Sequence, residues 1–218
     1  MSQLIFKFPF KTSYFKKDFF VSSNNFNAYK LIESWPKWPD KKINIFGPSG
    51  CGKTHLANIL SKKLKLLNID SDKFKEDTNR LIENYDCIVI DNYTGNINES
   101  HLYSTLNHVS QLNKCIIINS KIELKQLDIK LNDLKSRLDS FLNIQILLPT
   151  DELLRVIIAK TFSDKQIKLT NRNLEFIIKN IERSYEKIFQ FIKDIDNISL
   201  STGKSININL IKKVLINE

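Results

Sequence analysis

The sequence predicts an α/β fold in which a parallel sheet of five strands is covered by helices and is followed by a small all-helical domain. Two observations support this prediction. Short apolar segments rich in β-branched residues alternate with segments of helical periodicity as far as Pro149, and after Pro149 only helical patterns remain. Such alternation is typical of a parallel sheet with helices on both faces.

Each predicted strand is an apolar, mostly β-branched run that is bounded by turn or helix signals. The five segments are 42–46, 65–70, 87–91, 115–119 and 144–148. Helical periodicity predicts helices over 24–35, from Gly52 onward, and over 100–112. Because a helical segment separates most of the strands, we expect the strands to run parallel to one another.

The segment after Pro149 has four helical patterns and no convincing strand. They cover 151–165, 173–181, 184–195 and 206–216. Asp151 is expected to cap the N-terminus of the first of these helices. The sequence therefore predicts an N-terminal arm over 1–12, an αβα domain over 13–150 and a helical lid domain over 151–218.

Composition and charge indicate a cytoplasmic protein. The chain has 218 residues and a net charge of +9, and no apolar run approaches the roughly 20 residues that a membrane helix needs. Lys7 interrupts the apolar N-terminal run and no small-residue cleavage site follows it, so a signal peptide is not indicated. The excess of lysine suits a nucleic-acid partner, although a composition rich in Lys, Asn and Ile explains part of it.

The three cysteines predict buried free thiols. Cys51, Cys87 and Cys115 are widely spaced, and the last two lie inside apolar runs. An odd number of cysteines without metal-ligand spacing indicates neither a disulfide framework nor a metal site.

The strongest motif is GPSGCGKT, which fits the phosphate-loop pattern G-x-x-x-x-G-K-[ST] without a mismatch. It has the required context, because a predicted strand precedes it and a predicted helix follows it. Its glycines let the backbone wrap around phosphate oxygens, Lys53 would reach the β- and γ-phosphates, and Thr54 would hold Mg²⁺. The residues of the loop are Gly47, Pro48, Ser49, Gly50, Cys51, Gly52, Lys53 and Thr54. ADP or ATP, with Mg²⁺, are the expected cofactors.

A carboxylate for the magnesium ion follows the third predicted strand. In YDCIVIDN an apolar strand ends in Asp91. We expect that strand to lie beside the strand that leads into the loop, so that Asp91 reaches the metal through water. The next residue is Asn92, where many P-loop ATPases have a second acidic residue that orients the attacking water. An amide is a much poorer base than a carboxylate, so slow intrinsic hydrolysis is expected.

Further motifs occur in a recognisable order. After GPSGCGKTHLA and the strand that ends in ID come a polar strand end at Asn119 and Ser120, then LKSRLDS, LPTDELLRVIIAK and IERSYEKI. Together they resemble the AAA+ ATPases, and in particular their DnaA-like initiator branch, over roughly residues 17–218. The most specific part of this resemblance is LKSR before the last predicted strand, with the helical domain after it.

The resemblance implies roles for further residues. Asn119, with Ser120 beside it, matches the first sensor of the γ-phosphate, and Arg183 matches the second sensor, which reaches from the lid to the nucleotide of the same chain. Arg137 matches the arginine finger, which enters the nucleotide site of a neighbouring molecule. His55 belongs to the GKTHL run that the family shares, and it is placed with the nucleotide-binding residues without a catalytic role.

Within this branch the chain resembles the Hda family of regulatory inactivators. Initiators of the DnaA type carry an N-terminal domain and a C-terminal helix-turn-helix domain, and this chain is expected to have neither, because it begins with a short arm and ends at Glu218 after the predicted lid. The pair formed by Asp91 and Asn92 is also similar to that family's version of the strand end.

The resemblance gives the N-terminal arm a function as well. Hda-like proteins begin with a clamp-binding peptide of the form QL-x-L-x-L-P or QL-x-L-P, and here the text is QLIFKFP, with Phe for Leu at two positions. Docked as an extended peptide, Gln3, Leu4, Phe6 and Phe8 would contact the sliding clamp, the β subunit of DNA polymerase III. The alternative for this segment is an edge strand packed on the αβα domain.

The implied function is regulatory inactivation of the replication initiator DnaA. Bound to the DNA-loaded clamp, the protein would stimulate hydrolysis of DnaA-bound ATP through Arg137 and so prevent re-initiation. Direct contact with DNA would be weak, a homo-oligomer is compatible with the family, and a nucleoid or replisome location follows. Two alternatives stay open: a helicase loader or DNA remodeller that binds single-stranded DNA, and a clamp adaptor without trans catalysis. A small-molecule kinase would share the loop but would explain neither LKSR nor the helical domain.

Overall fold

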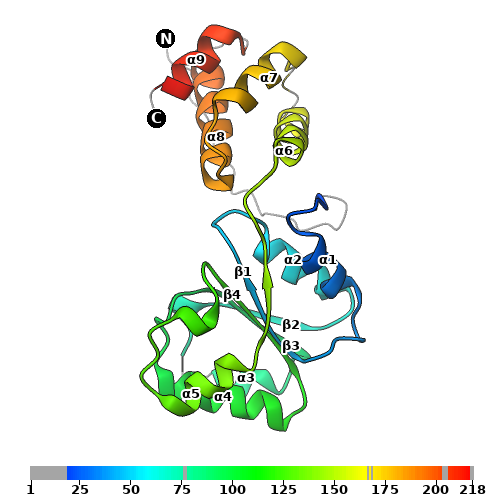
Figure 1. Ribbon diagram of the computed structural model, residues 1–218, viewed down its shortest axis with the longest axis vertical. Helices are drawn as coiled ribbons and strands as arrows, with labels where there is room; N and C mark the ends of the chain where they lie inside the picture. The colour runs from blue at the N-terminus through cyan, green and yellow to red at the C-terminus, as the bar shows by residue number, and fades with distance from the viewer. Residues whose placement is uncertain (1–18, 76–77, 166, 168, 203–205, 217–218) are drawn as a thin grey trace. The chain divides into compact units, whose positions relative to one another are not determined.

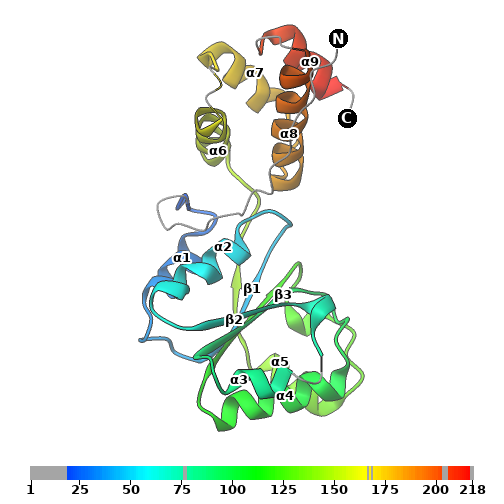
Figure 2. The same ribbon diagram turned by 180° about the vertical axis from the view of Figure 1, so that it is seen from behind.

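The computed structural model describes residues 19–75, 78–165, 167, 169–202 and 206–216. These residues form two compact units, which we call the core unit and the helical unit (Figures 1 and 2). The core unit ends at Leu147, and the helical unit begins at Leu148.

The core unit is built on a sheet of five parallel strands in the order β2-β3-β4-β1-β5. The strands are β1 Lys42–Phe46, β2 Leu66–Asp70, β3 Cys87–Tyr93, β4 Cys115–Ser120 and β5 Leu142–Gln145. Every residue of β4 is buried, as are the first four residues of β3, because helices cover both faces of the sheet. The predicted five-stranded parallel sheet is thus confirmed.

The strand order corrects one prediction. The expectation that β3 lies beside β1 is wrong, because β4 lies between them. Residues Ile116 to Ile118 of β4 pair with β1 on one side and with β3 on the other. β4 is buried along its whole length, and an apolar strand of this kind takes a central position in a parallel sheet.

The fifth strand begins and ends earlier than the predicted 144–148. β5 pairs with residues Ile43 to Phe46 of β1, and the N–H of Ile146 adds one more bond to the carbonyl oxygen of Phe46 at 2.8 Å. Pairing stops there because β1 ends and its chain turns away at Gly47. The predicted strand was extended to 148 because Leu147 and Leu148 are apolar, but both side chains are exposed and lie outside β5.

Helices lie on both faces of this sheet (Figures 1 and 2). The helices are α1 Phe26–Glu33, α2 Lys53–Ile59, α3 Thr78–Ile82, α4 Glu99–Gln111 and α5 Asn132–Asp139, with short 3-10 turns at Leu60–Lys62, Ser71–Lys73 and Leu124–Gln126. α1 and α2 cover one face, and α3, α4 and α5 cover the other. This division follows from right-handed crossovers, because the connection from β1 to β2 runs across the sheet in the opposite direction to the later ones. Sequence patterns predicted α1, α2 and α4, but neither the short elements over 71–82 nor α5.

A buried asparagine ties two strands of the core unit together. Asn44, in β1, is fully buried, and its Nδ2 donates to the carbonyl oxygen of Ile118 and to Oγ of Ser120, both at 2.9 Å. Its Oδ1 accepts from the N–H of Leu124 at 3.3 Å. The side chain therefore joins β1 to β4 and to the turn that follows β4.

Replacing Asn44 with valine should destabilise the core unit by about 2–3 kcal/mol, because it leaves the Leu124 N–H and the Ser120 hydroxyl with fewer partners in a buried place. Urea denaturation followed by tryptophan fluorescence measures this, since Trp35 and Trp38 both lie in the core unit. The matched control is Asn68→Val, an exposed asparagine of β2, which should change stability by less than about 0.5 kcal/mol. Equal effects at both positions would contradict the role given to Asn44.

The helical unit packs four helices around one apolar core. They are α6 Asp151–Asp164, α7 Asn171–Asn180, α8 Tyr185–Thr202 and α9 Ile208–Ile216. Side chains from all four meet in that core, among them Phe162, Ile177, Phe191 and Ile211. All four predicted helical patterns are present.

Thr150, and not Asp151, caps the N-terminus of α6. The Thr150 hydroxyl accepts from the N–H of Leu153 at 3.3 Å, and its backbone has the extended conformation of a cap residue. Asp151 is the first residue of the helix, and its carboxylate pairs with Arg183 instead. The prediction was wrong because two adjacent residues are good caps, and only the backbone conformation decides between them.

The three cysteines are free and buried, as predicted. In the part of the chain that the structure describes, no group of three His, Cys, Asp or Glu side chains could hold a metal ion. None of the helices over the described residues is long and apolar enough to cross a membrane.

Candidate nucleotide site

The loop from Gly47 to Gly52 joins the end of β1 to the start of α2. Gly47 has a φ of +153° and Gly52 a φ of +94°, in a region that residues with a side chain rarely adopt. A Cβ atom on Gly47 would lie 2.4 Å from the carbonyl oxygen of Ile146, so only glycine fits beside the chain that follows β5. Among the described residues, the N–H groups of Ser49 and Gly50 have no protein acceptor. Free amides in such a loop are what a phosphate group needs.

Lys53 is folded back onto this loop. Its side chain is buried, with 8% of the residue exposed, and Nζ donates to the carbonyl oxygens of Gly47 at 2.8 Å and Pro48 at 3.0 Å. Nζ also lies 3.8 Å from Sγ of Cys51. Burial raises the pKa of the Cys51 thiol, and the nearby Lys53 charge partly opposes this. Phosphate oxygens are charged and therefore stronger acceptors than the two carbonyl groups, so a bound nucleotide would draw the ammonium group away from them.

Three side chains from α2, β3 and β4 meet at the carboxyl end of the sheet. The Thr54 hydroxyl donates to Oδ2 of Asp91 at 2.5 Å, and Nδ2 of Asn119 donates to Oδ1 of Asp91 at 3.2 Å. Asn119 is fully buried, and its Oδ1 has no partner within the described residues. A buried polar atom without a partner calls for an explanation, such as a bound ligand or water.

These residues fit a nucleotide with Mg²⁺. The Thr54 hydroxyl and the Asp91 carboxylate are oxygen ligands of the kind that Mg²⁺ takes, directly or through water. Lys53 and the free amides of the loop could bind phosphate oxygens, and the unpartnered oxygen of Asn119 could accept from water beside them. The bound nucleotide would supply the phosphoryl group, while the chain holds the phosphates and neutralises their charge.

Asn92 lies in a β-bulge directly after Asp91. The register of β3 against β4 shifts here, and Asn92 has a φ of +58°, which asparagine tolerates better than most residues. Its Nδ2 donates to Oδ2 of Asp70, the last residue of β2, at 2.8 Å. This bond and the N–H of Asp72 lower the pKa of Asp70 below its ordinary value. Sequence analysis missed Asp70 because it lies 22 residues from Asn92, and only strand pairing makes them neighbours.

Phe19 is a second residue beside the loop that sequence analysis missed. Its ring meets His55 edge to face, with centroids 5.4 Å apart, and stacks on Tyr29 at 5.9 Å. A Cβ atom on Gly52 would come within 3.0 Å of the Phe19 ring. His55 therefore lies in the first turn of α2 against an aromatic group that could stack on an adenine ring. The available signal was the aromatic run before the first helix, which nothing in the sequence connects to the loop.

Arg137 lies near the amino-terminal ends of the strands, whereas the phosphate loop lies at their carboxyl ends. It is exposed in the last turn of α5, and over the described residues its guanidinium has no partner. The carbonyl oxygen of Arg137 accepts from the N–H of Ser140 at 3.2 Å, and Oγ of Ser140 accepts from Nζ of Lys42 at 2.8 Å. Lys42 is the first residue of β1, whereas the loop follows the last residue of β1.

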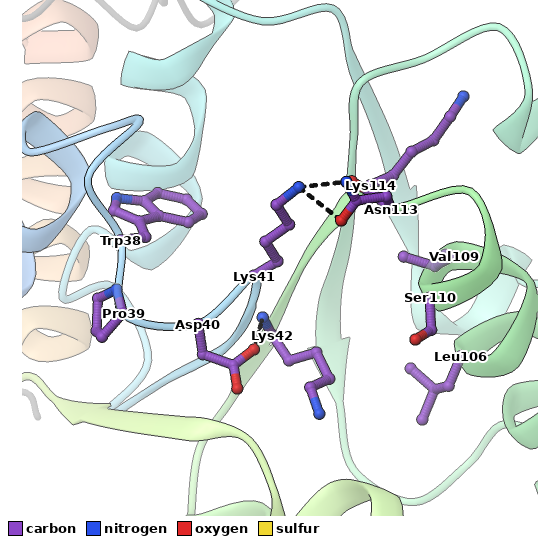
Figure 3. A pocket seen from close by; sticks show the side chains of 10 residues that line it. All are labelled: Trp38, Pro39, Asp40, Lys41, Lys42, Leu106, Val109, Ser110, Asn113 and Lys114. Carbon is purple, nitrogen blue, oxygen red and sulfur yellow. Dashed lines mark hydrogen bonds between the residues drawn. The ribbon is translucent and has the colours of Figure 1, made fainter.

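A pocket of about 420 Å³ lies at this same amino-terminal edge (Figure 3). Three lysines line it, and each ammonium group is held by neutral acceptors. Lys41 donates to the carbonyl and side-chain oxygens of Asn113, Lys42 to Ser140, and Lys114 to the carbonyl oxygens of Ile82 and Glu83. Three lysines therefore place positive charge around this pocket, which Asp40 also lines.

Arg183 lies in the helical unit, in the turn between α7 and α8. Its Nε donates to Oδ1 of Asp151 at 2.9 Å, and Nη2 donates to Oδ2 at 3.2 Å. Arg183 lowers the pKa of Asp151, so the stability that this pair contributes is present at neutral pH and is lost as the pH falls below 3.8 through the lowered pKa. Both side chains are exposed, at 62% and 47%, so the contribution is small and the guanidinium is available to another anion.

The predicted clamp-binding residues Gln3, Leu4, Phe6 and Phe8 lie outside the described residues. The structure thus brings together the loop, Asp91 and Asn119 at one end of the sheet. Arg137 lies at the other end of the sheet, and Arg183 belongs to the helical unit.

No family model matches the chain. In sequence it is 29% identical to the chromosomal replication initiator protein DnaA of Borrelia garinii subsp. bavariensis, over 98% of this chain and 55% of that protein. It is 28% identical to the DnaA of Borreliella burgdorferi, over 98% of this chain and 50% of that protein. The chain spans about half the length of the curated relatives it matches.

Solved structures resemble the chain more closely in fold than in sequence. Domain III of the Thermotoga maritima replication initiation protein DnaA superposes with a TM-score of 0.81 at 23% identity, covering 96% of this chain and 98% of that domain. The initiator DnaA bound to AMPPCP and single-stranded DNA gives a TM-score of 0.70 at 19% identity, over 84% of this chain and 64% of that one. The Thermotoga maritima RuvB Holliday junction branch migration motor gives a TM-score of 0.66 at 17% identity, over 88% of this chain and 67% of that one. The chain therefore has the fold of the DnaA-like AAA+ ATPase domain, and it is similar to DnaA in sequence along nearly its whole length.

Proposed function

We propose that this protein is a nucleotide-binding regulator of replication initiation that stimulates ATP hydrolysis by the initiator DnaA. Recruited to the DNA-loaded sliding clamp, it presents Arg137 to the nucleotide site of ATP-bound DnaA. Hydrolysis leaves the initiator with ADP, and the origin does not fire again. The observation that carries this proposal is the position of Arg137, exposed and without a partner among the described residues, at the sheet edge remote from the loop of its own chain.

The geometry of β1 separates Arg137 from its own nucleotide site. β1 has five residues, and a strand of that length spans about 16 Å. The backbone of Arg137 lies near the first residue of β1 through Ser140, and the loop follows the last. This separation supports a role for Arg137 at a nucleotide that is bound to another molecule.

The charge of this edge suits such a target. A nucleotide site presents phosphate groups, and Lys42, whose ammonium group donates to Ser140, places positive charge near Arg137. Opposite charges steer association and fix the orientation of the two molecules. A guanidinium that reaches the γ-phosphate neutralises the charge that develops during transfer, which is worth about 10³–10⁵ in rate for well-studied arginine fingers.

The protein's own site holds ADP or ATP with Mg²⁺ in this proposal. Lys53 and the loop amides bind the phosphates, Thr54 and Asp91 hold the metal ion, and Asn119 reads the γ-phosphate through water. The unpartnered buried oxygen of Asn119 supports a ligand here, and a DnaA of the same fold has been solved with AMPPCP bound.

The clamp-binding role belongs to Gln3, Leu4, Phe6 and Phe8. An extended peptide with a glutamine and alternating apolar residues binds through one polar contact and a hydrophobic pocket. Such a peptide binds modestly by itself, but the clamp is multimeric and holds the complex on DNA, which raises the effective concentration.

The test is phosphate release from ATP-bound DnaA, mixed with this protein, with and without DNA-loaded clamp. We expect strong release only when all three components are present. Clamp binding without stimulated release would contradict trans catalysis and leave an adaptor function. Absence of clamp binding, measured by surface plasmon resonance with a Gln3→Ala variant as control, would remove the role of the arm.

A helicase loader or DNA remodeller is the second candidate. Two observations favour it: the net charge of +9, and a structural neighbour that has been solved with single-stranded DNA. This candidate requires tight binding to single-stranded DNA without clamp, and DNA-stimulated ATPase activity of the protein's own site. Fluorescence anisotropy with a labelled oligonucleotide at two salt concentrations separates it from the first proposal, because phosphate contacts weaken steeply with salt.

A further inference from the structure

Two carboxylates lie side by side at the carboxyl end of the sheet. Asp70 and Asp91 are register partners on the adjacent parallel strands β2 and β3, so their Cα atoms are about 5 Å apart. Asp91 accepts from Thr54, which marks the expected magnesium position. Asp70 is therefore one strand further along the same edge, next to the metal carboxylate.

Asn92 connects these two carboxylates. Its backbone N–H donates to Oδ1 of Asp91 at 3.1 Å, and its Nδ2 donates to Oδ2 of Asp70 at 2.8 Å. The bulge in β3 and the positive φ turn the side chain of Asn92 toward β2. A continuous chain of hydrogen bonds thus runs from Thr54 through Asp91 and Asn92 to Asp70.

Asp70 retains acceptor capacity for water. Its Oδ1 accepts from the N–H of Asp72 at 3.1 Å and its Oδ2 from Asn92, whereas a carboxylate can accept about four bonds in all. The residue is only half-buried, so water reaches it. The same two bonds lower its pKa, and it is ionised at neutral pH.

Hydrolysis of a bound nucleotide needs an acceptor that orients the attacking water, and the amide of Asn92 cannot take a proton from it. We propose that Asp70, held by Asn92, is the carboxylate that orients this water in the protein's own site. This inference rests on the nucleotide-binding part of the proposed function but not on DnaA or the clamp.

The step balances as ordinary hydrolysis. The water oxygen forms a bond to the γ-phosphorus, the bond from that phosphorus to the β,γ-bridging oxygen breaks, and its electron pair stays on ADP. The proton of the water passes to the Asp70 carboxylate and from there to solvent. Because the transition state of phosphoryl transfer is loose, orientation matters more than basicity, and an ionised carboxylate of low pKa is suited to it.

The experiment is single-turnover hydrolysis of radiolabelled ATP by the full chain without DnaA, with affinity for a fluorescent ATP analogue measured in parallel. Lys53→Ala sets the background. We expect Asp70→Asn to lower the hydrolysis rate by at least 10-fold toward that background, while its affinity for the analogue stays within about 2-fold, because the residue contacts water and not the phosphates.

Asp72→Asn is the matched control. It removes the same charge two residues away, and its side chain faces Asn96, whose Nδ2 donates to Oδ1 of Asp72 at 2.6 Å. Its hydrolysis rate should equal that of the wild-type protein. Equal loss in Asp70→Asn and Asp72→Asn would overturn the inference, because it would show a general effect of charge or of the 3-10 turn.

The exchange Asp70→Asn with Asn92→Asp separates chemistry from structure. It moves the carboxylate from β2 to the bulge of β3, and the amide introduced on β2 can donate to that carboxylate while its oxygen accepts from the N–H of Asp72. We expect the double variant to recover most of the lost rate. Recovery of thermal stability without recovery of rate would overturn the inference, as would a wild-type rate no higher than that of Lys53→Ala. Failure to bind the analogue at all would instead refute the nucleotide site, and failure of DnaA stimulation would leave this result untouched.

Discussion

Arg137→Ala is expected to reduce the stimulated hydrolysis of DnaA-bound ATP by about 10³-fold or more. The physical reason is that a guanidinium group can donate two hydrogen bonds to the phosphoryl group during its transfer. No other described cation at that end of the sheet has this planar, bidentate geometry. The variant should fold normally, because Arg137 is exposed and its side chain has no partner among the described residues. The measurement is phosphate release with DnaA and DNA-loaded clamp at saturating concentrations.

Two controls sharpen this result. Lys135→Ala removes an exposed positive charge from the same helix and should leave stimulation within about 2-fold. A single exposed charge that does not contact the phosphates is largely screened by salt. Arg137→Lys keeps the charge but should recover little, since an ammonium group cannot make the bidentate contact. Clamp binding should be unchanged in all three variants. Full stimulation by Arg137→Ala would refute the proposed function.

Lys53→Ala is expected to weaken nucleotide binding by about 100-fold, which corresponds to the loss of charge-assisted hydrogen bonds to two phosphates. Without nucleotide, the same change removes two hydrogen bonds, from Nζ to the carbonyl oxygens of Gly47 and Pro48, which lowers stability. It also removes a buried charge, which raises stability. These effects on stability oppose each other, so the melting temperature of the free protein should change little.

Isothermal titration with ATP and with ADP measures this loss of affinity. Lys62→Ala is the control, because Lys62 is an exposed lysine just beyond α2 that takes no part in the loop. Its affinity should equal that of the wild-type protein. Wild-type affinity in Lys53→Ala would mean that the loop does not bind the phosphates as proposed.

Local patterns predicted most of the fold, because most of it is locally encoded. β1 occupies the predicted 42–46, since a short apolar run between polar residues has only one way to form a buried strand. β5 could not be placed from its own sequence, because its end is set by the end of β1, about a hundred residues earlier. The strand order could not be predicted from local patterns either, because it depends on which strands pair with each other in the folded sheet.

The candidate site shows the same division. The phosphate loop was predictable because contiguous residues form it, and Asp91 because it directly follows an apolar run, although β3 continues to Tyr93. The position of Asn92 in a bulge and its bond to Asp70 depend on tertiary pairing, and so does the contact of Phe19 with His55. A single sequence identifies site residues that are contiguous or that follow an apolar run more readily than residues that strand pairing brings to the site.

The buried amide of Asn44 has a consequence for ligand screening. Because it locks the strand that leads into the loop to the strand that carries Asn119, the core unit should lose both in one cooperative transition. Any nucleotide that binds the loop then stabilises the whole core unit by mass action, by about 2.7 kcal/mol when it is present at a hundred times its dissociation constant. A thermal-shift comparison of ADP, ATP and other nucleotides would therefore rank the cofactors of this protein without any knowledge of its partners.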